Sequence, residues 1–279
     1  MKPSRLIDCH VHLNNYHEAT RRPTEENVQE LFRQMEDAGI DHAVVISSYK
    51  VDLDRPSAEE LMEVLAMDRR TTLVEGLRWR GDVRTDLFGM EERIRDGLVK
   101  GIKLYPGYDH YPINDPSLET VFRVAEKHDV PVMIHTGDTY AKTAKVRMAH
   151  PLLVDDIAVD YPDVKFVMCH LGNPWFMDAA EVLYKNDNVY ADISGLTLGE
   201  FTYDFERYVA MRLKEMISYM GDPEKQLMYG SDWPLVDMKP YVKLLGELDF
   251  NEEQLEHVAW KTAATLFKIP MEPVETSLE

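Results

Sequence analysis

The chain has 279 residues, 44% of them hydrophobic and 10% aromatic, which is enough apolar surface for one large packed domain and excludes disorder on composition. Asp and Glu total 50 against 31 Lys and Arg, and the formal charge of −19 disfavours binding to nucleic acid or anionic membranes. No run of about 18 apolar residues and no signal-peptide pattern occurs, so we expect a cytoplasmic protein. Cys9 and Cys169 are the only cysteines, and we expect both to be reduced and buried.

Short apolar or alternating segments recur along the chain and predict eight β-strands. They cover residues 5–12, 42–48, 72–78, 101–105, 131–136, 165–171, 188–194 and 227–232. Segments with helical periodicity lie between them, which is the pattern of βαβ units and a parallel sheet. The predicted fold is therefore α/β, a single (β/α)8 TIM barrel over residues 1–270, with a polar tail at 271–279.

Several helix boundaries are marked by residues that favour them. Thr24, Ser57 and Asp115 are placed to cap the starts of helices, and Gly39 lies where a helix should stop. A last helix is predicted at 251–267, where it would close the outer layer of the barrel.

In a barrel of this type the active site lies at the carboxyl ends of the strands. These ends carry side chains that ionise or bind metals: His10 and His12 on the first strand, Lys103 on the fourth, His135 on the fifth, His170 on the sixth and Asp232 on the eighth. Neutral imidazoles with a carboxylate are suitable ligands for a divalent ion such as Zn²⁺. The sequence therefore predicts a metal centre of one or two ions at the barrel mouth.

The direction of each side chain follows from the strand period. Residues two apart on a strand face the same side, so His10 and His12 should point into the barrel while Cys9 faces the helices. By the same rule His170 should stand above an inward-facing Met168.

Two of these residues have several possible roles. Asp232 is the candidate general base, because a carboxylate beside a bound ion can take a proton from its water; the alternative is a turn cap before Trp233. Lys103 lies between Ile102 and Leu104, which should face the helices, so its side chain should point into the barrel. There it is a carboxylated bridge between two ions, a charged contact to substrate, or one half of a structural ion pair.

Further polar and aromatic side chains follow the strands and are candidates for substrate binding: Arg78, Arg80, Tyr105, Asp138, Trp175 and Trp233. A guanidinium after the third strand would suit a substrate carboxylate, although a salt bridge to an acidic loop explains it at least as well. The aromatic residues are as often loop packing as pocket lining. We expect a small-molecule substrate and no nucleic-acid or membrane partner, and a homo-oligomer is left open.

Motifs spread over nearly the whole chain carry a family resemblance. They are Ile-Asp-Cys-His-Val-His at 7–12, Gly-Ile-Lys-Leu-Tyr-Pro at 101–106, Pro-Val-Met-Ile-His-Thr-Gly at 131–137, His-Pro-Leu at 150–152, Val-Lys-Phe-Val-Met-Cys-His-Leu-Gly at 164–172 and Tyr-Gly-Ser-Asp-Trp-Pro at 229–234. Together they resemble the amidohydrolase superfamily, in its amidohydrolase-related group of metal-dependent hydrolases with the TIM-barrel fold. The resemblance implies that His10, His12, His135 and Asp232 bind a catalytic ion, and that His170 binds a second ion or polarises the substrate.

The activity that the resemblance implies is hydrolysis, in which metal-activated water attacks an amide, ester or lactone carbonyl of a small molecule with Asp232 as general base. The predicted catalytic residues are Asp232, His170 and Lys103. One alternative within the family is metal-dependent, non-oxidative decarboxylation of an unsaturated or aromatic acid. The other is a non-catalytic barrel with a structural metal, which an open site at the barrel mouth disfavours.

Overall fold

The computed structural model describes residues 2–16, 18–66, 68–79, 83–196, 203–221 and 225–271. Its centre is a sheet of eight parallel strands in sequence order. The strands are β1 (Ile7–Val11), β2 (His42–Ile46), β3 (Thr71–Gly76), β4 (Ile102–Leu104), β5 (Val132–His135), β6 (Phe166–Cys169), β7 (Val189–Asp192) and β8 (Leu227–Met228). Backbone hydrogen bonds between β1 and the chain at and after β8 close the sheet, with Cys9 N 3.0 Å from Tyr229 O and Asp232 N 2.8 Å from His10 O.

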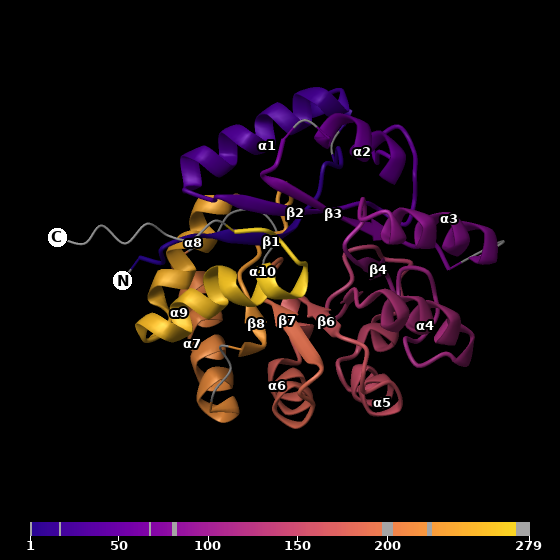
Figure 1. The fold of residues 1–279 in the computed structure, drawn as a ribbon. Helices are drawn as coiled ribbons and strands as arrows, with labels where there is room; N and C mark the ends of the chain where they lie inside the picture. Colours follow the sequence, from indigo (N-terminus) through magenta and orange to yellow (C-terminus); the bar gives the residue numbers. More distant parts are fainter. Residues whose placement is uncertain are drawn as a thin grey trace.

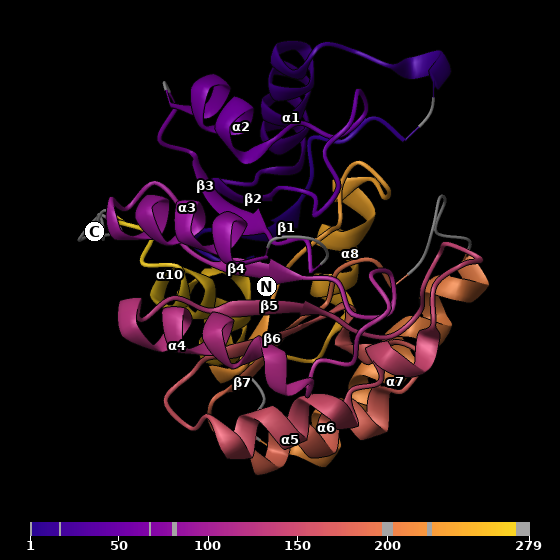
Figure 2. The same cartoon turned by 90° about the vertical axis from the view of Figure 1, so that its right-hand side faces the viewer.

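A helix follows each strand and packs outside the sheet. These helices are α1 (Thr24–Ala38), α2 (Ala58–Leu65), α3 (Val83–Arg95), α4 (Glu119–His128), α5 (Leu152–Asp160), α6 (Phe176–Lys185), α7 (Tyr203–Met220) and α8 (Met238–Glu247). Figures 1 and 2 show α1 and α2 on one side of the strands and α5 and α6 on the opposite side. The predicted (β/α)8 barrel is confirmed, with all eight strands inside or within one residue of the predicted segments.

Shorter helical segments complete the structure. They are 3₁₀ turns at Glu18–Thr20, Pro116–Leu118, Val146–Ala149 and His170–Gly172, and a final run made of α9 (Glu252–Glu256), a π-helical segment (His257–Lys261) and α10 (Thr262–Leu266). The run therefore follows α8, which already completes the outer ring of helices. Its residues Ala263 and Leu266, and Phe267 directly after it, pack in one cluster with strand residues such as Ile7 and Val44. Leu255, Val258 and Ala259 of the same run pack in the other cluster, with the apolar faces of the helices. The prediction that this segment closes the outer layer is therefore confirmed for its first part and corrected for α10, whose apolar side chains pack with the inner residues of the strands.

The predicted helix boundaries are mostly confirmed. Ser57 and Asp115 each accept a hydrogen bond from a backbone N–H in the helical turn that follows, and Gly39 ends α1 with a left-handed φ of 72°. Thr24 is not a cap, because it is already the first helical residue and Pro23 precedes it without a side-chain hydrogen bond.

The buried side chains form two clusters, one in the outer layer between the helices and the strands and one in the barrel interior. Ile102, Leu104 and Met168 belong to the outer cluster, together with the apolar faces of the helices. The strand residues of the inner cluster are Ile7, Cys9, Val44, Ile46, Val74, Met133, Val167, Cys169 and Met228. The prediction that Met168 faces inward is therefore wrong, because β6 turns Val167 and Cys169 to the interior instead.

A register irregularity in β1 changes the direction of its side chains. The pairing of β1 with β2 shifts between Asp8 and Val11. Cys9 belongs to the inner cluster and Val11 to the outer one, so the prediction that Cys9 faces the helices is wrong. A bulge of this kind can re-aim a side chain, and here it lets the consecutive residues Cys9 and His10 both reach the interior. Cys9 and Cys169 are free and buried, as predicted.

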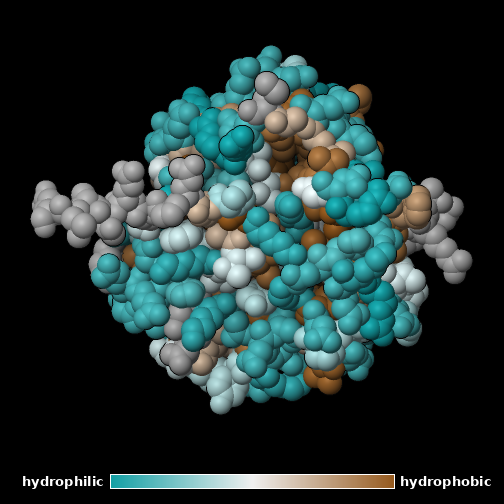
Figure 3. All heavy atoms as spheres, viewed as in Figure 1, coloured by the Kyte–Doolittle hydropathy of each residue, from teal (hydrophilic) through white to brown (hydrophobic). Residues whose placement is uncertain are grey.

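The surface agrees with the composition. Figure 3 shows that the face seen in Figure 1 is mainly hydrophilic, with hydrophobic residues around a hollow in its upper part. Over the described ranges, no helix has both the length and the apolarity needed to cross a bilayer.

Candidate functional site

Four histidine rings form a row at the carboxyl ends of β1, β5 and β6. The centroid of the His10 ring lies 5.2 Å from that of His12 and 4.9 Å from that of His170, and the His170 ring lies 5.0 Å from His135. Each of the four residues is buried, with at most 9% of its surface exposed. The structure thus brings together histidines that lie on or directly after three separate strands.

Hydrogen bonds fix one ring nitrogen of His10 and one of His12. His12 Nδ1 lies 2.8 Å from the carbonyl oxygen of Ile46, which can only accept, so Nδ1 carries the proton. His10 Nδ1 lies 2.9 Å from Oδ2 of Asp192. Both Nε2 atoms lie near Oδ1 of Asp232, at 3.7 Å for His10 and 3.5 Å for His12. The two Nε2 lone pairs and a carboxylate oxygen therefore meet at one point.

The donor set of His10, His12 and Asp232 fits a divalent metal ion. The ligand atoms all lie within 4.8 Å of one another. Among the buried side chains of the described residues, His10 Nε2 is the one nitrogen or oxygen without a hydrogen-bond partner. An unsatisfied buried polar atom costs about 1–3 kcal/mol, and an ion that accepts its lone pair would remove that cost. Imidazole nitrogen and carboxylate oxygen are common ligands of Zn²⁺.

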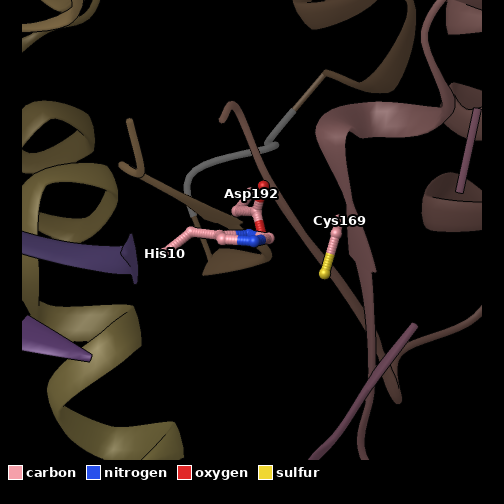
Figure 4. Close-up of side chains that lie close together, drawn as sticks. All are labelled: His10, Cys169 and Asp192. Carbon is pink, nitrogen blue, oxygen red and sulfur yellow. The ribbon is translucent and has the colours of Figure 1, made fainter. Parts of the chain in front are cut away.

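His10 also belongs to a second candidate group, with Cys169 and Asp192. Figure 4 shows the His10 ring directed toward Asp192. Cys169 lies on β6, the strand next to β7, which carries Asp192. The nitrogen of His10 that faces Asp192 is already hydrogen-bonded, and Lys103 Nζ lies 2.8 Å from the Cys169 sulfur. An ion here would meet an ammonium group, so the group with His12 and Asp232 is the better metal site.

His170 and His135 reach the row in different ways. β6 ends at Cys169, and His170 follows with a φ of 63°, a left-handed conformation that is uncommon for residues other than Gly. This turn of the backbone lets His170 reach the site although its neighbour Cys169 also faces inward. His135 ends β5, and its Nε2 lies 2.8 Å from the carbonyl oxygen of Asp138, which leaves Nδ1 as its lone-pair atom.

Asp192, the last residue of β7, is a site residue that was not predicted from the sequence. It is fully buried, and its carboxylate accepts hydrogen bonds from the His10 ring and from the backbone N–H of His170, both at 2.9 Å. An acidic residue in an apolar strand, at the same barrel end as the histidines, was the signal that could have identified it.

Lys103 points into the barrel as predicted, because its neighbours Ile102 and Leu104 belong to the outer cluster. Only 1% of Lys103 is exposed. Its Nζ lies 2.8 Å from the Cys169 sulfur and 5.2 Å from the centroid of the Tyr105 ring. The lysine is therefore packed between a thiol and an aromatic face, which also places the predicted substrate residue Tyr105 deep in the barrel.

Burial controls the protonation of the site. Burial and the nearby Lys103 lower the pKa of His10 and that of His12 to about 3. Burial, followed by the neighbouring His10, lowers the pKa of His170 to about 3. Burial raises the pKa of Asp232 well above its usual range. The histidines are therefore neutral near pH 7, which is the form that binds a metal ion.

These shifts predict how the stability of metal-free protein depends on pH. Below about pH 6.5 the unfolded chain protonates its histidines, whereas the folded site does so only near pH 3. Stability should therefore fall as pH falls from 7 to 5. Asp8 opposes this, because burial raises its pKa to about 7, and burial also raises the pKa of Asp232 and of Glu75. The four site histidines and His42, whose pKa burial lowers to about 4, outnumber these three acids. Urea unfolding of EDTA-treated protein checks this, and an equal or higher midpoint at pH 5 would contradict it.

A cavity of about 60 Å³ lies against the row of histidines. Its described lining is Tyr108, His135, Asp138, Tyr140, His170, Asn173, Gly195, Asp232 and Leu235. The cavity thus joins the predicted ligands His135, His170 and Asp232 to the predicted substrate residue Asp138. Its small volume suits the reacting group of a substrate rather than a whole ligand.

The structure does not bring the other predicted substrate residues to this cavity. Arg78 is exposed and lines a separate cavity of about 270 Å³ between α2 and α3. Trp175 stacks on His150 with ring centroids 4.6 Å apart, and Trp233 is 6% exposed within the outer cluster. Arg80 lies outside the described residues. A substrate role for these side chains stays a prediction.

Gly195 allows the close approach of two site residues. A Cβ atom at this position would lie 2.6 Å from His170 Nδ1 and 2.7 Å from Asp232 Oδ2, and its φ of 56° also favours glycine. We expect Gly195→Ala to lower activity about 100-fold by displacing both side chains. Gly246→Ala is the matched control, since a Cβ there meets no atom within 4 Å. Activity and thermal unfolding of both variants test this, and a twofold or smaller loss for Gly195→Ala would contradict it.

Comparison with known proteins identifies the family. A family model described as amidohydrolase matches residues 7–269, which is nearly the whole chain. No curated protein matches the sequence. The family match includes every residue of the proposed metal site.

Solved structures with the same fold carry different activities. An uncharacterized TIM-barrel protein from Bordetella bronchiseptica has a TM-score of 0.74 at 17% identity, covering 95% of this chain and 98% of its own. A dihydroxybenzoic acid decarboxylase from a Polaromonas species, with bound manganese, has a TM-score of 0.62 at 12% identity, covering 96% and 97%. A dihydroorotase from Campylobacter jejuni has a TM-score of 0.61 at 16% identity, covering 98% and 86%. These likenesses support the barrel fold.

Proposed function

The chain belongs to the amidohydrolase family, and we propose that it is a metal-dependent hydrolase acting on the amide, ester or lactone carbonyl of a small molecule. The observation that carries this proposal is the convergence of His10 Nε2, His12 Nε2 and Asp232 Oδ1 beside a cavity. Membership of the family indicates a metal-dependent enzyme. The geometry of the site supports hydrolysis as its reaction.

His10, His12 and Asp232 would hold the ion, with His135 and His170 as neighbouring lone-pair donors. When bound, a divalent ion acts as a Lewis acid that polarises a carbonyl and lowers the pKa of water. The nitrogen and oxygen donors suit Zn²⁺, and Mn²⁺ is the second ion to test, because the Polaromonas neighbour is described with manganese.

The two oxygens of Asp232 have different surroundings, which suggests different roles. Oδ1 faces His10 and His12, whereas Oδ2 lies on the side of Gly195 and His170. We assign Oδ1 to the ion and Oδ2 to the proton that is taken from water and passed to the leaving group. A carboxylate within hydrogen-bond reach of a reacting water can act as a general base.

The charge of the cavity favours a neutral carbonyl substrate. Its described lining contains two acidic side chains, Asp138 and Asp232, and neither Lys nor Arg. A substrate carboxylate placed there would meet the acidic Asp138 and no basic side chain of the described lining, with the ion as its main source of attraction. An uncharged amide, ester or lactone avoids this repulsion. This observation favours hydrolysis over decarboxylation, which needs a carboxylate at the reacting centre.

We propose that the site holds one ion and that Lys103 stays an ammonium group. The Cys169 sulfur, 2.8 Å from Lys103 Nζ, occupies space that a carboxylated lysine would need. Metal content after reconstitution with Zn²⁺ should therefore be one ion per chain. Two ions per chain, or a modified lysine in a metal-loaded crystal structure, would contradict this.

A substrate panel tests the reaction. Metal-loaded protein is incubated with lactones, amides, esters and unsaturated or aromatic acids, and product acid and CO₂ are measured separately. We expect acid release from neutral substrates that requires metal. Release of CO₂ would support the decarboxylase alternative, whereas bound metal without either product would support a structural metal.

A further inference from the structure

Asp192 makes an unusual number of contacts for a residue outside the proposed donor set. Its Oδ2 accepts from the His10 ring at 2.9 Å, and its Oδ1 accepts from the backbone N–H of His170 at 2.9 Å. Oδ1 also accepts from the backbone N–H and the hydroxyl of Ser194, at 3.1 Å and 2.5 Å. One carboxylate on β7 therefore contacts residues on β1 and after β6.

Ser194 extends these contacts to both rings. Its Oγ lies 3.0 Å from His10 Nδ1 and 2.9 Å from His170 Nδ1. A hydroxyl has one proton, and the short contact to the Asp192 carboxylate takes it, because charge-assisted hydrogen bonds are the stronger ones. The hydroxyl oxygen can then only accept from the two imidazoles.

The partners of each ring define its tautomer. His10 Nδ1 faces the carboxylate of Asp192, so it must donate. His170 Nδ1 lies 3.1 Å from the carbonyl oxygen of Ser194, which also requires a donor. Both rings therefore carry their proton on Nδ1 and keep an Nε2 lone pair.

We propose that Asp192 and Ser194 are positioning residues that hold His10 and His170 in the same tautomer, so that both present Nε2 as a lone-pair donor. The proposal rests on the proposed metal site, where it deepens the role of His170. With Nδ1 pinned as a donor, neutral His170 accepts at Nε2. It binds an ion or orients a water molecule, and it does not donate a hydrogen bond from Nε2 to a substrate carbonyl.

Asp192 and Ser194 are close enough in sequence to act as one unit. Asp192 ends β7 and Ser194 follows two positions later, and both are fully buried. Loss of a hydrogen bond that orients a ligating histidine typically lowers metal affinity about 10- to 100-fold. Because one hydroxyl serves two rings, Ser194→Ala should disturb both histidines, whereas Asp192→Asn should disturb His10 most directly.

The test reads tautomers and metal affinity, not activity. Metal-free protein with ¹⁵N-labelled histidine is examined by long-range ¹H–¹⁵N NMR, with His10→Gln and His170→Gln used for assignment. We expect Nδ1–H for both rings in the wild type and a tautomer mixture in Ser194→Ala and Asp192→Asn. Competition with a chelator should show Zn²⁺ dissociation constants about 10- to 100-fold higher in both variants.

Ser47→Ala is the matched control. Ser47 is also a buried serine after a strand, but its hydroxyl accepts from the backbone N–H of Gly76. We expect it to leave tautomers and zinc affinity unchanged. Unchanged tautomers and affinity in Ser194→Ala and Asp192→Asn would overturn the proposal. Wild-type protein that binds no Zn²⁺ would instead remove the metal function, while the NMR measurement would still decide the tautomers.

Discussion

Replacing His10 and His12 together by alanine should abolish metal binding, because the variant loses both nitrogen ligands that face Asp232. Asp232 with His135 and His170 alone lacks the two Nε2 atoms that face Oδ1, and is a poorer site for a divalent ion. Metal content after reconstitution and gel filtration is the measurement, and we expect about one ion per wild-type chain and none in the double variant. Stoichiometric metal in the double variant would show that His10 and His12 do not bind the ion.

A matched double variant separates this effect from damage to the fold. His42 and His128 lie away from the site, where His42 contacts Thr72 and His128 contacts Glu91. His42→Ala with His128→Ala should bind metal like the wild type, although it loses two histidines as well. Loss of metal from this control would show that the assay reports stability rather than ligation.

The barrel was predictable from sequence because its signals are local and repeated. Each apolar strand segment is short and each is followed by a helical stripe, so an error at one boundary leaves the others intact. The cluster of His10, His12, His135, His170 and Asp232 was predictable for a related reason, since parallel strands bring their carboxyl ends to one side of a barrel.

The direction of individual side chains was less predictable, because it depends on backbone irregularities. The strand period fails at Cys9, where the pairing of β1 shifts, and at His170, where the strand has ended and φ is positive. Both histidines still reach the site, but through a bulge and a turn that the residue pattern does not show. The prediction for Met168 is wrong for the same reason. It assumed that Met168 and His170 share a strand face, whereas the strand ends before His170 and Met168 faces outward.

The hydrogen-bond partners of the ligands were also hidden. Asp192 and Lys103 are 89 positions apart in the chain, and neither residue shows from its own neighbours that it lies beside Cys169 or His10. The sequence left three roles open for Lys103, and its contact with Cys169 disfavours the carboxylated bridge. Such contacts require the closed barrel, which brings together site residues on or after β1, β4, β5, β6, β7 and β8.

Asp232→Asn should lower turnover about 100- to 10,000-fold while the protein still binds metal at high concentration. The amide keeps an oxygen near His10 and His12 for the ion but cannot accept the proton assigned to Oδ2. The measurement is kcat at saturating metal, on whichever substrate the panel identifies. Loss of kcat with KM nearly unchanged would mean that the carboxylate acts in the transition state rather than in substrate binding.

Asp138→Asn is the matched control, because Asp138 is the other acidic residue of the cavity and its contact with His135 uses its backbone oxygen. Removing the exposed carboxylate charge of Asp138 leaves the His135 ring in place, so kcat should change less than about tenfold. If Asp138→Asn were the more damaging variant, the proton would belong to Asp138, and Asp232 would be a metal ligand alone. Equal and small effects in both variants would instead mean that neither acid moves the proton. One of the four site histidines would then be the general base.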